Sequence, residues 1–355
     1  MAALRIGVMG CADIARRRLL PAMRTAEGID LAAVASRDPA KAAEFAHRFD
    51  CRPVLGYAEL LARDDVDAVY LPLPAALHAH WAEAALRAGK HVLAEKPLAT
   101  EPEQVERLVA LARSAGLVLM ENVMFPHHPQ HEAVRKLVAT GAIGELRLLS
   151  SSFTVPRLPA GDIRLQAALG GGALWDTGVY PVRAALHLLG DGLEVIGAAL
   201  PRRGPGGEVD TSGTALLSAP GGIGVQLAFG LDHGYRSMYE LCGSEGRITV
   251  ERAFTPPPDW APLVRLERQG KVEEIRLPPA DQVAAALAAF VGAVRAGADP
   301  GSGAGSIAQC RLLHAIRRAA TPVAVPAPGA PCPLLAGEVA VGAEPDAPQI
   351  FRGID

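Results

Sequence analysis

The sequence has 355 residues, of which 50% are hydrophobic, and a formal net charge of −3 at pH 7. That length is too great for one ordinary domain and suits two, and the hydrophobic share is ample for sizeable cores. A near-neutral chain without a run of Lys or Arg argues against nucleic acid or an anionic membrane as a partner. We expect neither partner, although a few residues could still hold a diphosphate.

Five cysteines are scattered along the chain without a CxxC pair: Cys11, Cys51, Cys242, Cys310 and Cys332. Their odd number and their spacing argue against a disulfide framework and against a structural zinc site. An apolar strand pattern starts at Leu4 and leaves no room for a signal peptide, and no apolar stretch reaches membrane-spanning length. The sequence therefore predicts a soluble cytoplasmic protein.

Short apolar runs alternate with helical patterns up to about Asn122. Thr100 and Glu103 have the spacing of a capping box before one of the helices, with Pro102 in its first turn. Strands that alternate with helices of this length predict an N-terminal Rossmann domain over residues 1–122, an α/β fold with a doubly wound parallel sheet. We expect its strands at Leu4–Met9, Leu31–Ala35, Ala68–Leu73, His91–Ala94 and Val118–Met120, and its helices at Ile14–Ala26, Pro39–Phe49, His78–Ala88 and Pro102–Ala115.

The pattern changes after a predicted helix at Pro129–Thr140, because strands then follow one another. Pro220-Gly221-Gly222 predicts a hairpin turn between two of them. We expect a C-terminal α+β domain over residues 123–330, built on a large, mostly antiparallel open sheet, and an irregular tail over residues 331–355. The strands are expected at Glu145–Val155, Leu193–Leu200, Thr214–Ser218, Gly224–Phe229, Met238–Cys242, Arg247–Glu251, Leu263–Glu267 and Val272–Leu277, and two late helices near Gln282–Ala296 and Ser306–Ala319.

A glycine-rich turn, Gly10-Cys11-Ala12-Asp13-Ile14-Ala15, follows the first strand and opens the first helix. It is a variant of the GxGxxG/A fingerprint, in which backbone N–H groups and a helix N-terminus bind a pyrophosphate. Ala12 weakens the match, because its Cβ stands where the pyrophosphate comes nearest. Gly10, Cys11, Ala12, Asp13 and Ile14 are therefore candidate cofactor-binding residues, and a plain strand–turn–helix is the alternative.

The end of the second strand carries Ser36-Arg37, where a NAD-binding site would place Asp or Glu for the ribose 2′-hydroxyl. A guanidinium beside a hydroxyl suits a 2′-phosphate instead. Asp38 next door keeps open the alternative that Arg37 is an ordinary solvated residue. We favour NADP(H) as the cofactor.

Two further stretches carry groups suited to acid–base chemistry. Glu95-Lys96-Pro97 follows a buried strand at its carboxyl end, where α/β sheets bind ligands, and Pro97 restricts the backbone of Lys96. Residues 170–181 form a glycine-rich loop that enters a helix and carries Asp176 and Tyr180, which share a face if the segment is helical. Each of these side chains could instead be purely structural, but their joint presence behind a Rossmann fingerprint favours an active site.

These motifs resemble the Gfo/Idh/MocA oxidoreductases, and the resemblance extends to about Val325. It rests on residues 5–15, 71–78, 88–97 and 170–190. In that family the lysine of the Glu-Lys-Pro motif is at the active centre, and the later motif usually reads Asp-x-Gly-x-His. Here Tyr180 replaces the histidine, as in a subset that includes xylose and dihydrodiol dehydrogenases and NDP-hexose 3-ketoreductases.

Within that subset, several stretches resemble the 3-ketoreductases of deoxysugar biosynthesis most: residues 10–15, 71–74, 121–125, 127–131 and 162–164. The resemblance implies NADPH-dependent reduction of the C3 ketone of a dTDP-linked 3,4-diketo-2,6-dideoxyhexose. It also implies that Leu73, His78 and Glu95 line the nicotinamide ribose region and that Tyr57 lies near the adenine. Arg164 and Trp175 are implied to contact cofactor or substrate.

Reduction of a ketone needs a proton donor or a fixed positive charge near the developing alkoxide. Tyr180 can donate its hydroxyl proton, and Lys96 can stabilise the charge, lower the pKa of the tyrosine or donate a proton itself. Both groups start near pKa ~10, so the sequence does not rank them. Asp176 would hold a substrate hydroxyl or orient Lys96. His127, His128 and His131 could be read as metal ligands, but hydride transfer needs no metal and the spacing argues against one.

Two other functions remain open. A free-sugar (xylose or glucose) or trans-dihydrodiol dehydrogenase would share the Rossmann half, Lys96 and Tyr180. A NADP-sensing regulatory protein without turnover would have no use for a proton donor beside the nicotinamide. For the second domain, an open apolar sheet face needs a partner, which together with the resemblance predicts a homodimer or homotetramer.

Overall fold

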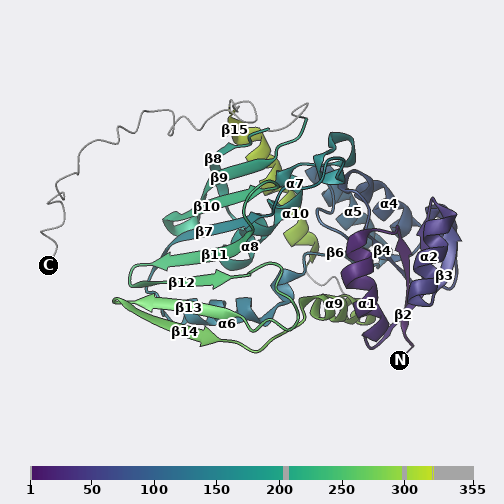
Figure 1. Ribbon diagram of the computed structural model, residues 1–355, viewed down its shortest axis with the longest axis horizontal. Helices are drawn as coiled ribbons and strands as arrows, with labels where there is room; N and C mark the ends of the chain where they lie inside the picture. Colours follow the sequence, from purple (N-terminus) through teal and green to yellow (C-terminus); the bar gives the residue numbers. More distant parts are fainter. Residues whose placement is uncertain (1, 203–207, 298–301, 322, 324–355) are drawn as a thin grey trace, which may run out of the picture. The chain divides into compact units, whose positions relative to one another are not determined.

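The N-terminal sheet has six parallel strands in the order β3-β2-β1-β4-β5-β6, which is the strand order of a Rossmann fold (Figure 1). The computed structural model describes residues 2–202, 208–297, 302–321 and 323. This sheet confirms the predicted N-terminal fold class. Its strands are β1 (Leu4–Met9), β2 (Ile29–Ser36), β3 (Arg52–Leu55), β4 (Ala68–Leu71), β5 (His91–Ala94) and β6 (Leu119–Glu121).

The helices of this half are η1 (Ala15–Leu19), α1 (Leu20–Thr25), α2 (Pro39–Phe49), α3 (Tyr57–Leu61), α4 (Ala75–Arg87) and α5 (Pro102–Ala115). The first one opens with a π-helical turn, in which the N–H of Leu20 donates to the carbonyl of Ala15. Pro21 has no N–H to donate to the preceding turn, which disfavours a regular α-helix at this point. The capping box predicted before α5 is wrong, because Glu101 is the N-cap residue and no side chain caps the helix.

The sequence pattern did not reveal β3 and α3. Arg52-Pro53-Val54-Leu55 is a four-residue edge strand with only Val54 buried, so it has neither a continuous apolar run nor a clear alternation. Pro53 is compatible with this position because an edge strand needs fewer ladder hydrogen bonds.

The second sheet has nine strands in the order β14-β13-β12-β11-β7-β10-β9-β8-β15 (Figure 1). It is mostly antiparallel, as predicted, with two parallel pairs, β7 with β10 and β8 with β15. The turn Pro220-Gly221-Gly222 joins antiparallel β9 and β10, with both glycines at positive φ, and confirms the predicted hairpin. The strands are β7 (Leu146–Thr154), β8 (Glu194–Ala199), β9 (Ser212–Ala219), β10 (Ile223–Gly230), β11 (Arg236–Gly243), β12 (Gly246–Glu251), β13 (Leu263–Arg268), β14 (Lys271–Arg276) and β15 (Ala320–Thr321).

One face of the second sheet is covered by helices α7 (Ala173–Asp176), α8 (Val179–Leu189) and α10 (Ser302–Ala319). Helix α6 (Pro129–Ala139) precedes the sheet along the chain. The apolar residues of the helix-covered side form one core, which includes Leu149, Leu217 and Phe229 from the strands and Val182 from α8. Among the described residues, no helix combines the length and the hydrophobicity needed to cross a membrane.

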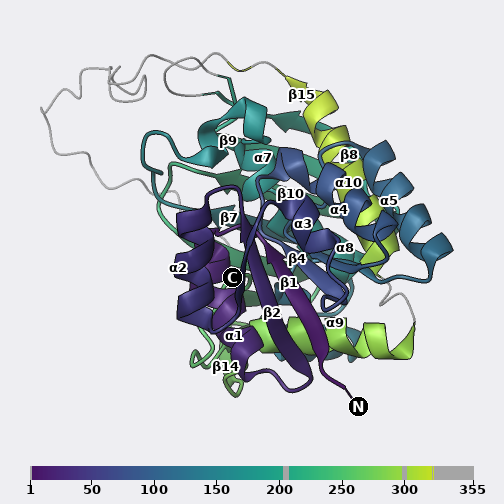
Figure 2. The same cartoon turned by 90° about the vertical axis from the view of Figure 1, so that its right-hand side faces the viewer.

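Helix α9 (Gln282–Ala296) comes late in the chain but packs against the first sheet. Leu287 and Phe290 share a buried core with Ile6 and Val8 of β1, and α9 lies beside α1 (Figure 2). The expected boundary at residue 122 assigned α9 to the second domain, whereas residues 1–323 form one compact unit by their contacts. The predicted tail at 331–355 lies outside the described residues.

Candidate active site

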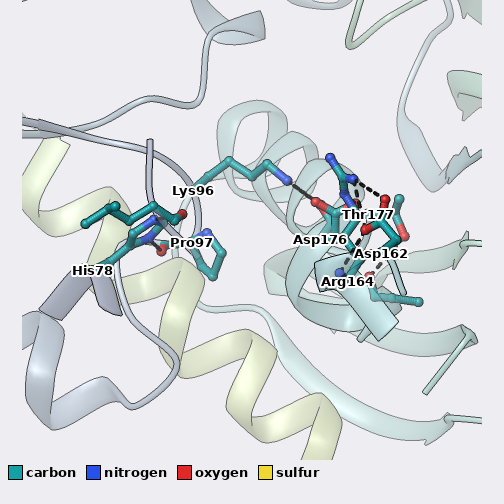
Figure 3. Close-up of polar contacts among 9 residues, drawn as sticks. His78, Lys96, Pro97, Asp162, Arg164, Asp176 and Thr177 are labelled. Atoms are coloured by element: carbon teal, nitrogen blue, oxygen red, sulfur yellow. Dashed lines mark hydrogen bonds and ion pairs between the residues drawn. The ribbon is translucent and has the colours of Figure 1, made fainter. Parts of the chain in front are cut away.

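Lys96 lies just beyond the carboxyl end of β5, followed by a cis peptide bond to Pro97. The preceding residues Val92, Leu93 and Ala94 are buried on both faces of the sheet, which fixes the backbone that carries the lysine. The side chain of Lys96 extends away from the first sheet, and its ammonium group contacts Asp176 in the second half of the chain (Figure 3). The strand end therefore places a charged group where parallel sheets bind ligands.

The segment that meets Lys96 is built from α7 and α8. Gly172, at φ 125°, precedes α7, where a Cβ atom would lie 2.6 Å from Oδ1 of Asp210. Asp210 in turn accepts a hydrogen bond from the N–H of Leu174 at 2.7 Å, which satisfies one of the free donors at the start of this short helix. A glycine is thus required at 172, and the turn it permits sets the position of Asp176.

An ion-pair chain joins the two halves of the molecule at this point (Figure 3). Nζ of Lys96 donates to Oδ1 of Asp176 at 2.6 Å and to its backbone carbonyl at 2.9 Å. The other oxygen, Oδ2, lies 3.0 Å from Nε of Arg164, and Arg164 also contacts Asp162 at 3.3 Å. Asp176 therefore orients both cations, and its side chain is 23% exposed.

Lys96 and Asp176 are both charged near neutral pH. Burial alone would lower the pKa of Lys96, but the carboxylate of Asp176 outweighs it and the pKa is raised. Burial would raise the pKa of Asp176, yet Lys96 and Arg164 together lower it. Lys96 is therefore a fixed cation beside a fixed anion in the protein without ligands.

Tyr180 lies at the start of α8 and faces the same ammonium group. Nζ of Lys96 lies 5.2 Å from the centre of the Tyr180 ring, and the ring also packs against Phe153. Burial raises the pKa of Tyr180, and the positive charge of Lys96 partly offsets this effect. The phenol is therefore protonated at neutral pH and available as a proton donor.

His78 is buried and bridges two backbone carbonyls instead of facing open space. Its Nδ1 lies 2.7 Å from the carbonyl oxygen of Pro97 and its Nε2 lies 2.6 Å from that of Leu73 (Figure 3). Burial lowers the pKa of His78, while the two carbonyl oxygens favour the charged form. His78 thus fixes the loop after β4 to the turn that carries Lys96.

Glu95 is held by two residues to which the sequence analysis gave no role. Oε1 of Glu95 accepts hydrogen bonds from the hydroxyl of Tyr70 and from Nδ2 of Asn122, both at 2.8 Å. Tyr70 is in β4 and Asn122 follows β6, so the three residues come from neighbouring strands. A tyrosine within a buried apolar strand was the available signal for Tyr70, since a buried hydroxyl needs a partner.

The glycine-rich turn after β1 is closely packed. Gly10 has φ 120°, and a Cβ atom there would lie 3.0 Å from Cδ2 of Leu73 and 3.7 Å from the hydroxyl oxygen of Tyr57. Asp13 pairs with both Arg16 and Arg17 and is exposed, and Ile14 is the N-cap residue of the π-helical turn. Leu73 and Tyr57 therefore lie at the turn where a pyrophosphate is expected, while Asp13 points to its own helix.

The end of β2 places Ser36 and Arg37 beside this turn. Ser36 is buried and its Oγ accepts from the N–H of Asp38 at 3.1 Å, while Arg37 is exposed. Asp38 caps α2 by accepting from the N–H groups of Ala40 and Lys41, so its carboxylate is engaged with the helix. Burial raises the pKa of Tyr57, and the nearby guanidinium of Arg37 offsets part of this increase. Cys11 lies close by, with its Sγ 3.6 Å from the carbonyl oxygen of Lys41.

Trp175 and the histidines of residues 127–131 lie mainly within packed structure. Trp175 is 6% exposed in the core of the second sheet, with Arg317 over its ring at 5.9 Å. His131 is buried between Tyr239, at 2.9 Å, and the carbonyl oxygen of Ala253, at 3.1 Å. In the part of the chain that the structure describes, no group of three or more His, Cys, Asp and Glu is arranged to hold a metal ion.

Comparison with protein families gives two matches that together span most of the chain. Residues 4–123 match the GFO/IDH/MocA oxidoreductase family with a NAD-binding Rossmann fold. Residues 131–249 match the GFO/IDH/MocA C-terminal domain.

Individual relatives are similar over nearly their whole length. A dTDP-3,4-didehydro-2,6-dideoxy-alpha-D-glucose 3-reductase from Saccharopolyspora spinosa is 52% identical over 89% of this chain and 97% of its own. A D-xylose 1-dehydrogenase (NADP(+)) from Haloferax volcanii is 34% identical over 84% of this chain and 91% of its own. The crystal structure of a 3-ketoreductase from Actinomadura kijaniata with NADP and TDP-benzene is 50% identical, has a TM-score of 0.89, and is matched over 91% of this chain and 100% of its own.

Proposed function

Because the chain belongs to the GFO/IDH/MocA oxidoreductase family, we propose that it is an NADPH-dependent sugar-nucleotide 3-ketoreductase. Its reaction is reduction of the C3 ketone of a dTDP-linked 3,4-diketo-2,6-dideoxyhexose to the 3-hydroxy-4-keto sugar. The observation that carries the proposal is the meeting of Lys96, Asp176 and Tyr180 at the strand ends of a Rossmann sheet, in a chain 52% identical to a 3-reductase of that substrate.

The residues around the glycine-rich turn fit NADP(H). Gly10 adopts φ 120°, which L side chains rarely adopt, so the tight turn after β1 that a dinucleotide site needs is available to this glycine. Exposed Arg37 stands beside buried Ser36 at the end of β2, and the neighbouring Asp38 is used as a helix cap. This is the arrangement that suits a 2′-phosphate instead of a 2′-hydroxyl.

The catalytic roles follow from the charges at the site. NADPH, when bound, supplies the hydride for the carbonyl carbon of the substrate. Lys96, fixed by Asp176, offers a positive charge to the oxygen that becomes an alkoxide, and electrostatic stabilisation of this kind is usually large. Tyr180 donates its proton to that oxygen, since its hydroxyl is protonated and its ring lies under the same ammonium group.

Variants of the Actinomadura 3-ketoreductase support this assignment of the side chains. Structures of that enzyme include one with a lysine replaced by alanine, one with a lysine replaced by glutamate and one with a tyrosine replaced by phenylalanine, each with TDP-benzene and NADP. A lysine and a tyrosine are the two groups that we assign to the reaction here, as Lys96 and Tyr180.

The test of this function is a comparison of substrates under single-turnover conditions. NADPH oxidation is followed by stopped-flow absorbance with 3-keto dTDP-sugars, the same sugars linked to other nucleotides, and free keto sugars. We expect rapid oxidation only with the dTDP-linked substrates. Turnover of D-xylose or a trans-dihydrodiol with NADP⁺, and none with the dTDP-sugars, would instead establish the dehydrogenase alternative. NADPH binding without oxidation of any substrate would favour the regulatory protein.

We further propose that the enzyme acts in the cytoplasm as a homodimer or homotetramer joined through the open faces of the nine-stranded sheets. Cys11, Cys51, Cys242 and Cys310 are free thiols in the described residues, which suits a reducing compartment. The open face carries small residues such as Ser152 and Ala228, together with exposed Leu216 and Ile196, and forms a shallow hollow that could receive a second copy.

A further inference from the structure

The carboxylate of Glu121, which is not one of the proposed catalytic groups, connects the segment that carries Lys96 to the helix that carries Tyr180. Glu121, the last residue of β6, has a side chain that is 1% exposed. Its Oε1 accepts from the N–H of Leu98 at 2.9 Å and from Nε2 of Gln309 at 2.7 Å. Its Oε2 accepts from Nη2 of Arg183 at 2.5 Å and from Oγ of Ser306 at 2.7 Å. Both oxygens are thus fully used, by donors from three separate segments.

Arg183 is built into this cluster as closely as the glutamate. Its Nε donates to Oε1 of Gln309 at 2.6 Å, so the guanidinium bonds to two partners in a fixed plane. A Cβ atom on Gly305 would lie 2.6 Å from Nη1 of Arg183, so this glycine leaves the space that the guanidinium fills. The side chain of Arg183 is only 13% exposed.

Two of the segments held by Glu121 are those that carry the proposed catalytic residues. Leu98 comes two residues after Lys96, across the cis bond to Pro97. Arg183 comes three residues after Tyr180 on α8, almost one helical turn along. The hydrogen bonds from Glu121 to Leu98 and Arg183 therefore connect the end of the first sheet to α8. Lys96 and Tyr180 face each other across the same two segments, with 5.2 Å between the ammonium nitrogen and the centre of the ring.

We propose that Glu121 and Arg183 are positioning residues that set the separation of Lys96 and Tyr180 for the reaction. A buried ion pair gains little net stability over well-packed apolar residues, because both charges lose their hydration. The pair instead fixes geometry, since four hydrogen bonds to one carboxylate allow only one relative placement of α8 and the turn that carries Lys96. The proposal rests on the function proposed above for Lys96 and Tyr180.

The test is a double-mutant cycle between Arg183→Met and Tyr180→Phe, measured as kcat for the dTDP-sugar well below the unfolding temperature. We expect Arg183→Met to lower kcat by on the order of 10–10²-fold, as expected for a small displacement of reacting groups, with the Kd for NADPH unchanged. In the Tyr180→Phe background the same change should cost clearly less, because the tyrosine it positions has lost its hydroxyl. Arg183→Lys, which keeps the charge, should recover part of the rate.

A matched control separates positioning from general loss of an ion pair. Arg311 of α10 pairs with Glu106 of α5 at 2.6 Å on the surface, so Arg311→Met makes the same chemical change outside the cluster. It should leave kcat essentially unchanged, as exposed pairs contribute little. If Arg183→Met does not fold, Glu121→Gln replaces it in the same cycle with Tyr180→Phe.

Several outcomes would overturn the proposal. A normal kcat in Arg183→Met would do so, including the case in which only its unfolding temperature drops. An equal fold-decrease in kcat with and without the Tyr180 hydroxyl would do so as well. A crystal structure of Arg183→Met with NADP gives a readout that needs no turnover: we expect the Lys96 ammonium farther from the Tyr180 ring, and an unchanged distance contradicts us. Failure of the wild-type chain to reduce dTDP-sugars would reject the proposed function alone.

Discussion

Lys96 has its charge balanced before any ligand arrives. Asp176 accepts its hydrogen bond at 2.6 Å, and Arg164 neutralises part of the same carboxylate from the other side. A lysine held in this way keeps its proton, since its pKa is raised by Asp176. This favours Lys96 as a fixed charge and Tyr180 as the proton donor, although both have the chemistry to donate.

The relative weight of these two residues can be measured with single and double variants. Lys96→Ala should lower kcat by on the order of 10²–10⁴-fold, because it removes the charge that stabilises the alkoxide. Tyr180→Phe should cost less if the lysine or a water molecule replaces the donor. NADPH binding is checked separately by fluorescence titration. Near-normal turnover of Lys96→Ala would remove Lys96 from the mechanism, and activity in both variants would refute the site assignment.

We propose that the exposed guanidinium of Arg37 sets the choice of cofactor. Arg37→Asp should weaken NADPH binding by about 1.5–3 kcal/mol, the usual value for a lost hydrogen bond to a charged group, and should affect NADH far less. Arg48→Asp, the same charge change on an exposed residue of α2, is the control. Equal affinity of the unchanged protein for NADPH and NADH would contradict the prediction.

Local motifs predicted the residues that meet at the site, but not the residues that support them. Lys96, Asp176 and Tyr180 were found because each lies in a short pattern with a chemical meaning. Arg183 and Asn122 lie in stretches that carry the family resemblance, but neither belongs to a short pattern with a chemical meaning, and only the fold shows their contacts with Glu121 and Glu95. Trp175, which the resemblance implies to contact cofactor or substrate, is largely buried, at 6% exposed, and the implied contact stays a prediction.

At the scale of elements, strong periodicity gave accurate boundaries. The strand Leu4–Met9 and the helices Pro39–Phe49, Pro102–Ala115 and Gln282–Ala296 were predicted with the observed bounds. Short or irregular elements such as β3 were missed, because four residues with one buried side chain carry no period. The packing of α9 on the first sheet could not be predicted either, since a helical pattern shows which face is apolar but not what covers it.

The packing of α6 against β11 predicts how stability depends on pH. The carbonyl of Ala253 can only accept, so Nε2 of His131 donates to it and Nδ1 accepts from the hydroxyl of Tyr239, which requires a neutral ring. Burial, together with His187 and His128, lowers the pKa of His131 to about 3. The unfolded chain therefore binds an extra proton below pH ~6.5, and stability falls as the pH drops from there toward 3, by up to about 1.4 kcal/mol per unit.

Urea denaturation between pH 4.5 and 8 checks this dependence. His131→Gln should lower the free energy of unfolding at pH 8 but flatten its decline toward acid. Tyr239→Phe removes the hydrogen-bond partner of His131 but leaves the titrating imidazole in place. It should lower the free energy of unfolding at every pH and leave the slope of that free energy against pH unchanged. An equally steep decline in His131→Gln would show that other groups, such as His187, govern the acid transition.

At the scale of the whole molecule, the nine-stranded sheet has one face under helices and one without cover in the described chain. The uncovered face carries Leu216, 47% exposed, and Ile196, 63% exposed, among small side chains that allow close approach. If two copies meet through this face, a charge in its centre should separate them, because a buried unpaired charge is costly. Leu216→Arg should therefore sediment as a smaller species than the unchanged protein, which we expect to be a dimer or tetramer at micromolar concentration.

Leu55→Arg makes the same change at an exposed residue on the edge of the other sheet and should leave the assembly intact. A monomer for the unchanged protein would refute the assembly, and an unchanged assembly in Leu216→Arg would move the interface to another surface.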